Sequence, residues 1–395
     1  MNGRHKKLIV IGAAIVLLVL CLFVFGGRTK KQDDRALSDY SEEVTTEAEV
    51  ASESQAELNA DMEMLQEAME EDMASLSDAA NDTATVSDAT PTDVTEEAYI
   101  KSKYDIRIKD IMEDMSLNQK VAQMFIITPE TLTGYTAVYK AENVTKQAYA
   151  SKPVGGLIYR KPNLMSESQT RTMLLNTIDY SEDIAGVPAF LCIDEQGDEV
   201  NMILESKNFD TEEIDIENKT EIGDYLWSIG FNVEFGAIIT AEKLTDSKLS
   251  GVFKHFPGGM SKGEISSYNR AIKENKGMIM VTNEPVEGYT GEEPACLTEE
   301  IVTIVLRRDM NYKGVLITDS LSDNNVKSKY SAAQAATMAV NAGADMIYLP
   351  SDYNSAYNAI ISAVKNGDIS EERIDESVYR ILDAKLNMSP APSNE

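Results

Sequence analysis

Histidine and cysteine are scarce in this chain of 395 residues, which contains two histidines and three cysteines. His255 is the only histidine outside the first five residues. We predict no metal and no cofactor. Cys192 and Cys296 fall in strand or strand-end contexts. Two buried free thiols are the favoured interpretation for them, with a single disulfide as the alternative, so cysteine content leaves the compartment open.

Glycine is absent from residues 28–99, where proline occurs once, at Pro91. Residues 32–99 hold 21 acidic side chains and a single base, Arg35. Such a composition buries too little apolar surface to offset the entropy lost on ordering, so we predict a disordered acidic stalk over residues 28–99. Within it, apolar residues at spacings of three and four fit one face of a helix, either transient or in a short coiled coil: Leu58, Met62, Leu65, Met69, Met73 and Leu76.

Long apolar runs are also rare, and the one that exists, Leu8–Phe25, comes after three bases. It is long enough to cross a bilayer as a helix. A cleavable signal peptide would need a shorter core and small residues before the cut. We therefore predict a cytoplasmic tail and a transmembrane anchor over residues 1–27. The length and acidity of the chain beyond this run favour export, which gives a single-pass protein of the cell membrane with its remaining chain on the extracytoplasmic side.

Two classes of partner are disfavoured. The formal charge of −30 at pH 7 repels the phosphate backbone, so nucleic acid is not an expected partner. No glycine-rich phosphate fingerprint comes after the first predicted strands, which weakens the case for an open dinucleotide-binding sheet. An unrelated phosphate-binding barrel is a minor alternative.

From about residue 100 the pattern alternates between apolar, β-rich runs and helical periodicity. The predicted strands are Val121–Thr128, Val154–Tyr159, Ala189–Asp194, Val233–Thr240, Gly251–Phe256, Met278–Asn283, Gly314–Asp319 and Asp345–Leu349. The predicted helices are Ser166–Ser181, Glu217–Ile229, Thr298–Tyr312, Ala332–Ala342 and Tyr353–Lys365. Several strands are continuously apolar, as parallel strands covered on both faces are. The pattern predicts an α/β fold, a (β/α)₈ barrel of the TIM type, over residues 100–390.

Polar residues end three of these strands: Asp194, the pair Lys254 and His255, and Asp319. Functional side chains of such barrels gather at the carboxyl ends of the strands. A single aspartate there is also a common helix cap, but three equivalent positions together favour a functional site.

Several motifs occur in a fixed order along the barrel. They are Met115–Leu117, Lys120–Phe125, Val154–Ile158, Cys192–Gly197, Lys254–Gly258, Pro294–Thr298, Gly314–Ser322, Ala342–Met346, Gly367–Ser370 and Arg373–Val378. Each motif is weak alone, but the ordered set over residues 115–385 resembles the N-terminal barrel of glycoside hydrolase family 3. Among its members, the bacterial single-domain β-N-acetylhexosaminidases are the most similar.

The resemblance implies a retaining mechanism, in which a carboxylate attacks the anomeric carbon and a second group protonates the leaving oxygen. Asp319 matches the family's nucleophile. Asp194, Lys254 and His255 match residues that bind sugar hydroxyls. The implied substrate is a carbohydrate containing β-linked amino sugars of the cell-wall type.

The chain also departs from the family pattern. The loop at residues 258–267 lacks the Asp-Ser-His dyad that supplies the general acid/base, and Glu264 is its only carboxylate. The interval before the strand that ends at His255 is shortened and has no counterpart of a sugar-binding arginine. Glu199 stands where the family has another arginine. The sequence therefore predicts a degenerate active site.

These observations leave two functions open. One is a weak retaining β-N-acetylhexosaminidase with Asp319 as nucleophile and Glu264 as replacement acid/base. The alternative is a non-catalytic surface barrel that serves as a glycan-binding or protein-interaction module.

Overall fold

The computed structural model describes residues 96–194, 219–237, 248–257, 268–269, 272–273 and 277–392. The predicted tail and anchor, and the stalk up to residue 95, lie outside these ranges. No helix within the described ranges is long and apolar enough to cross a membrane. The anchor, the stalk and the membrane localisation therefore stay predictions.

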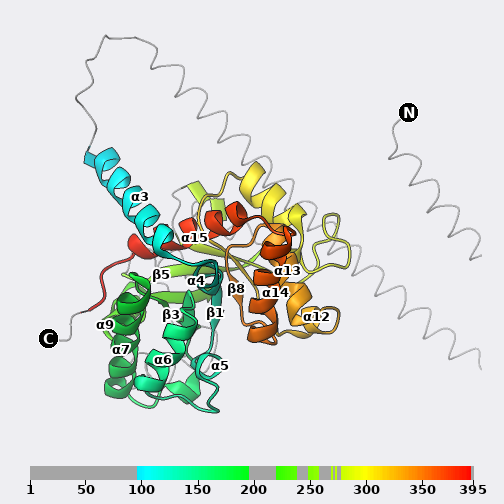
Figure 1. The fold of residues 1–395 in the computed structure, drawn as a ribbon. Coiled ribbons are helices and arrows are strands. Elements are labelled where there is room, and N and C mark those ends of the chain that lie inside the picture. The colour runs from blue at the N-terminus through cyan, green and yellow to red at the C-terminus, as the bar shows by residue number, and fades with distance from the viewer. Residues whose placement is uncertain are drawn as a thin grey trace, which may run out of the picture. The chain divides into compact units, whose positions relative to one another are not determined.

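Eight parallel strands form one sheet in the order β7-β6-β5-β4-β3-β2-β1-β8 (Figure 1). They are β1 Phe125–Ile127, β2 Gly156–Ile158, β3 Phe190–Asp194, β4 Val233–Ala237, β5 Ser250–Phe256, β6 Met278–Val281, β7 Leu316–Thr318 and β8 Ile347–Tyr348. A parallel bridge joins Ile317 to Met346, and the Thr318 amide donates to the Met346 carbonyl at 3.0 Å. These contacts bring β7 to β8, so the sheet curls into a nearly closed barrel and the predicted fold class is confirmed.

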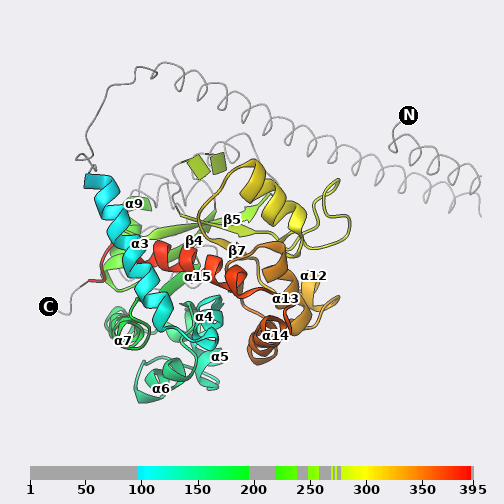
Figure 2. The ribbon, with the colours of Figure 1, turned by 45° about the horizontal axis from the view of Figure 1, so that its top comes forward.

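Helices cover the outside of the sheet (Figure 2). They are α3 Glu96–Asp114, α4 Leu117–Gln123, α5 Pro129–Thr133, α6 Asn143–Ser151, η1 Lys161–Asn163, α7 Glu167–Ala185, α9 Lys219–Ser228, η3 Ala295–Leu297, η4 Glu300–Asp309, α12 Asn324–Lys327, α13 Ala332–Ala342, α14 Tyr353–Asn366 and α15 Glu371–Leu386. Local sequence fixes several ends. The Ser331 side chain caps α13 by accepting from the Gln334 amide, and Gly343 ends it in the left-handed conformation.

The strands are apolar because both of their faces are covered. Four consecutive residues of β3, Phe190–Ile193, are fully buried between the barrel interior and the helices. Inside the barrel, the rings of Phe235 and Tyr348 stack with their centroids 5.0 Å apart. Because β4 and β8 lie opposite each other in the strand order, this contact crosses the interior.

Two boundaries differ from the sequence prediction. The strand expected from Val121 begins at Phe125, and the preceding residues belong to α4. Ser116 and Gln119 form a reciprocal capping box there, which favours helix over the β propensity of Val121. Helix α3 begins at Glu96, within the segment predicted as stalk, and it packs on α15, where the Tyr379 hydroxyl donates to Asp105 at 2.5 Å.

A single buried aspartate, Asp345, binds side chains and backbone from several elements at the amino-terminal end of the barrel. Asp345 is fully buried just before β8. Its carboxylate pairs with Arg307, accepts from Arg380 Nε at 3.0 Å and accepts from the Leu316 amide at 2.9 Å. Burial raises the pKa of Asp345, but the surrounding arginines outweigh burial and hold that pKa below its usual value.

Candidate active site

Asp319 comes directly after β7 and is 8% exposed. Its amide donates to the Val281 carbonyl at 2.9 Å, which fixes the backbone against β6. One carboxylate oxygen, Oδ1, accepts from the Ser320 amide at 2.7 Å. The other, Oδ2, lies 3.1 Å from His255 Nδ1 and accepts from the Asn283 amide at 3.4 Å. Residues at the ends of β5, β6 and β7 thus orient this single carboxylate.

Opposing influences act on the pKa of Asp319. Burial raises the pKa, whereas the hydrogen bond and charge of His255 and the two backbone amides lower it. The lowering influences win, so the pKa lies below the usual value for aspartate. Asp319 is therefore ionised at neutral pH, as a carboxylate nucleophile must be.

A second pair lies beside the first. Lys254 Nζ donates to Asp194 Oδ1 at 2.6 Å, joining the ends of β5 and β3. The Lys254 side chain is 5% exposed, but the Asp194 side chain is 34% exposed. The Tyr268 hydroxyl donates to the Lys254 carbonyl at 2.8 Å and supports this backbone. Asp194 thus presents a partly solvated carboxylate at the carboxyl end of the barrel.

The structure therefore gathers four of the five predicted site residues at one end of the barrel: Asp194, Lys254, His255 and Asp319. Glu264, with the rest of its loop at residues 258–267, lies outside the described residues.

Sequence reasoning missed two residues at the same end. Tyr348 is the last residue of β8, and its hydroxyl is hydrogen-bonded to the Arg160 side chain. Burial raises the pKa of Tyr348, and the nearby carboxylate of Asp194 raises it further, against the lowering influence of Arg160. Arg160 lies two residues beyond β2, so the strand-end rule that found Asp319 also covers it. The sequence prediction considered arginines only in the shortened interval and in the family motif after Asp194.

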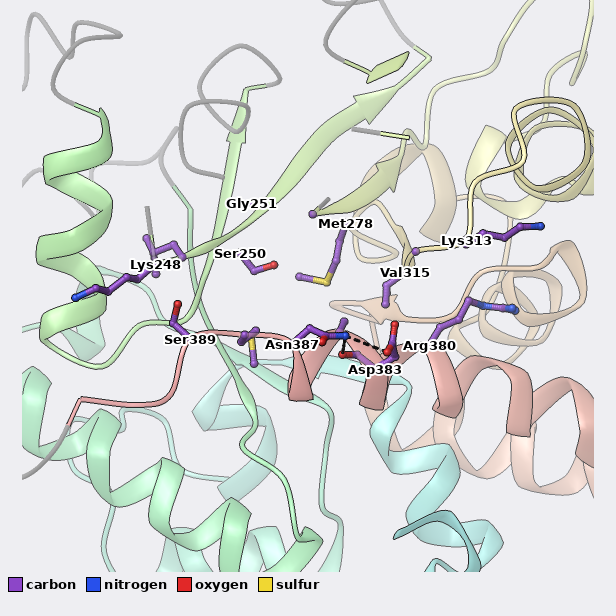
Figure 3. Close-up of a pocket in the computed structure, with 15 residues that line it drawn as sticks. Lys248, Ser250, Gly251, Met278, Lys313, Val315, Arg380, Asp383, Asn387 and Ser389 are labelled. Carbon is purple, nitrogen blue, oxygen red and sulfur yellow. Dashed lines mark hydrogen bonds between the residues drawn. The ribbon is translucent and has the colours of Figure 1, made fainter. Parts of the chain in front are cut away.

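A cavity of about 330 Å³ opens at the opposite, amino-terminal end, beside the last turn of α15 (Figure 3). The charged ends of Lys248, Lys313 and Arg380 point away from it in Figure 3. Lys248 Nζ lies 4.0 Å from the centre of the Trp227 ring, and Arg380 binds Asp345. The Asn387 side-chain amide in the lining donates to Asp383 Oδ1 at 3.0 Å. The strand-end residues predicted from the sequence lie at the other end of the barrel, so the candidate site is the carboxyl end.

Comparison with known proteins identifies the fold. Residues 241–384 match the sequence profile described as the Glycosyl hydrolase family 3 N terminal domain. Over residues 241–384 the barrel is thus similar to the N-terminal domain of glycoside hydrolase family 3. Among solved structures, it is similar to a family 3 β-N-acetylglucosaminidase from Paenibacillus sp., with a TM-score of 0.56 at 23% identity over 71% of this chain and 65% of that one. At this identity the likeness supports the fold alone.

The matches to curated relatives cover smaller parts of both chains. A secreted glycosyl hydrolase of Arthroderma benhamiae, uncharacterized, is 28% identical over 42% of this chain and 56% of its own length. A β-N-acetylglucosaminidase/β-glucosidase of Cellulomonas fimi is 27% identical over 24% of this chain and 17% of its own length. The chain thus spans about half or less of these curated relatives. Their names include both amino-sugar and glucose glycosidases.

Proposed function

We propose that this barrel is a retaining β-N-acetylhexosaminidase of low activity that hydrolyses β-linked amino sugars. The observation that carries the proposal is the state of Asp319. It is buried, ionised and held by three hydrogen-bond donors from three strand ends. A catalytic nucleophile requires this combination, because a fixed anionic oxygen must reach the anomeric carbon without reorganising.

The neighbouring pair suits sugar binding. Charged groups form the stronger hydrogen bonds to hydroxyls, and Lys254 orients Asp194 by a 2.6 Å contact. Asp194 is exposed enough to accept from a sugar hydroxyl while it remains paired. In this mechanism Asp319 attacks the anomeric carbon, a glycosyl ester forms, and water then releases the sugar.

The substrate class and the location complete the proposal. The motif order resembles the hexosaminidase branch of the family, and β-N-acetylglucosaminidases occur among the similar sequences and structures. The apolar run at Leu8–Phe25 would anchor the barrel outside the cell, facing cell-wall glycans. No cofactor takes part.

A specific observation favours a second function, a non-catalytic glycan-binding or protein-interaction module. The loop at residues 258–267 contains neither aspartate nor histidine, so the family's proton-donating dyad has no counterpart in it. Loss of a general acid/base lowers the rate by about 10²–10⁴-fold. A barrel that binds the sugar at this site but no longer turns it over would retain Asp194 and Lys254.

One experiment separates the two functions. The full chain is incubated with the 2,4-dinitrophenyl glycoside of a 2-fluoro sugar and digested, and labelled peptides are identified by mass spectrometry. Covalent label on Asp319, absent from Asp319→Ala, supports the glycosidase. Binding of N-acetylglucosamine without any label supports the module. Faster turnover of aryl β-glucosides than of aryl N-acetyl-β-glucosaminides would overturn the amino-sugar assignment.

A further inference from the structure

We propose that His255 is the general acid/base of this site, taking over the role that the loop dyad and Glu264 would otherwise fill. The inference rests on the proposed glycosidase function. It assigns the missing proton transfer to His255, a residue that the structure describes. His255 lies at the end of β5 beside the nucleophile rather than on the next loop.

The contact with Asp319 fixes how the imidazole is protonated. His255 Nδ1 lies 3.1 Å from Asp319 Oδ2. An ionised carboxylate only accepts hydrogen bonds, so Nδ1 must be the donor. The other ring nitrogen, Nε2, is then the atom that gains or loses a proton. One nitrogen therefore holds the nucleophile, and the other is available for proton transfer.

Position and exposure also suit the role. The His255 side chain is 42% exposed, whereas that of Asp319 is 12% exposed. The ring thus contacts the buried nucleophile and is still accessible to solvent. In retaining glycosidases that use two carboxyl groups, these groups lie about 5–5.5 Å apart. Since Nδ1 contacts the carboxylate directly, Nε2 lies one imidazole ring further out, near this separation.

The remaining partners of the nucleophile cannot transfer protons. Within the described ranges, the other hydrogen bonds to the Asp319 carboxylate come from the backbone amides of Ser320 and Asn283. His255 is the titratable side chain bonded to it there. Asp194 lies across the site, paired with Lys254.

The proton balance is complete with these groups alone. In the first step an Asp319 oxygen bonds to the anomeric carbon, the glycosidic C–O bond breaks, and the Nε2 proton passes to the leaving oxygen. In the second step Nε2 takes a proton from water, the resulting hydroxide oxygen bonds to the anomeric carbon, and the ester bond to Asp319 breaks. Asp319 becomes an anion again and His255 a cation.

The hydrogen bond couples the two events. While Asp319 is anionic, it stabilises the positive charge on the imidazole. Formation of the ester removes that negative charge, and with it the attraction that retains the proton. His255 therefore releases its proton as the leaving oxygen needs it.

A leaving-group comparison tests the proposal. His255→Gln keeps a polar side chain but cannot transfer a proton. We expect it to slow hydrolysis of di-N-acetylchitobiose, whose departing sugar is a poor leaving group, by about 10²–10⁴-fold. Release of 2,4-dinitrophenol from its N-acetyl-β-glucosaminide needs no protonation and should change much less, and azide should accelerate it.

Controls separate this proposal from the function on which it rests. Lys161→Gln, at an exposed cation at the start of η1, should leave both rates unchanged. Equal slowing of both substrates by His255→Gln, or selective slowing by Glu264→Gln in its place, would overturn the role of His255 while the glycosidase stands. If the wild type releases neither aglycone and the fluoro-sugar leaves no label, the glycosidase proposal fails, and the role of His255 fails with it.

Discussion

Two buried aspartates lie at opposite ends of the barrel and illustrate different uses of one residue type. At the amino-terminal end, Asp345 is fully buried among Arg307, Arg373 and Arg380. At the carboxyl end, the Asp319 carboxylate accepts hydrogen bonds from one histidine and two backbone amides. Both carboxyl groups have a pKa below the usual value.

The difference lies in what surrounds each charge. The arginines enclose Asp345, and Ser377 donates to it at 2.8 Å, so its carboxylate faces protein on every side that the structure describes. Asp319 is 8% exposed, and its histidine partner faces solvent. A depressed pKa alone therefore does not identify a catalytic carboxylate. Access to solvent at the carboxyl end of the barrel is the feature that favours the catalytic role proposed for Asp319.

The largest expected effect is on folding at the enclosed end. Asp345→Ala leaves three partly buried arginines without their shared counter-charge, which should lower the free energy of unfolding by about 3–5 kcal/mol. Urea denaturation followed by circular dichroism measures this. Asp368→Ala, at an exposed aspartate, should stay within about 0.5 kcal/mol of the wild type. A similarly small change at Asp345 would show that the arginine cluster is not structural.

The next effect is on chemistry at the open end. Asp319→Asn should change the unfolding free energy by no more than about 1 kcal/mol, because amide and carboxylate have the same shape and the site is partly solvated. Turnover should nevertheless fall by about 10⁴-fold, since the amide is a poor nucleophile. Assays with an aryl N-acetyl-β-glucosaminide and parallel urea titrations measure both. If Asp319→Asn lowered the free energy of unfolding as much as Asp345→Ala does, Asp319 would have a structural role and the two aspartates would not differ in use.

A buried lysine gives a third, smaller effect. Lys385 of α15 donates to Gln123 Oε1 at 2.7 Å, and burial lowers its pKa to about 7. Between pH 7 and its ordinary value of 10.5, the unfolded chain binds more protons than the folded one, so stability should rise with pH in this window. The limiting slope is about 1.4 kcal/mol per pH unit. Below pH 7 the buried amine of Lys385 is charged in the folded chain, so this lysine destabilises the fold most there.

Urea denaturation of Lys385→Met at pH 6, 8 and 10 tests this sign. The slope should disappear, and the variant should be more stable than the wild type at pH 6. Lys365→Met, at an exposed lysine of α14, should keep the slope. A wild-type stability that falls between pH 7 and 10 would contradict the prediction.

Sequence predicted the barrel well because period and burial are local signals, and Asp194, Lys254, His255 and Asp319 were found from strand ends. Other features depend on tertiary contacts. Nothing near residue 345 shows that its aspartate meets an arginine 38 residues earlier. The pairing of His255 with Asp319 spans 64 residues, so their hydrogen bond could not be derived from either motif. Shared motifs therefore gave the positions, and only the fold gave the partners.

The smallest expected effect concerns two thiols of the barrel, Cys192 in the middle of β3 and Cys296 in η3. Cys192 lies near Lys385, and Cys296 lies near the Asp319 carboxylate. Both are buried free thiols, and burial raises the pKa of each. The thiolate is the reactive form, so both should resist iodoacetamide at pH 8 in the native state and react fully in urea. Mass spectrometry of the two peptides measures this. Because Cys296 lies in the short helix η3 whereas Cys192 lies within the sheet, Cys296 should become reactive first as urea rises. Earlier reaction of Cys192 would contradict this order of local stability.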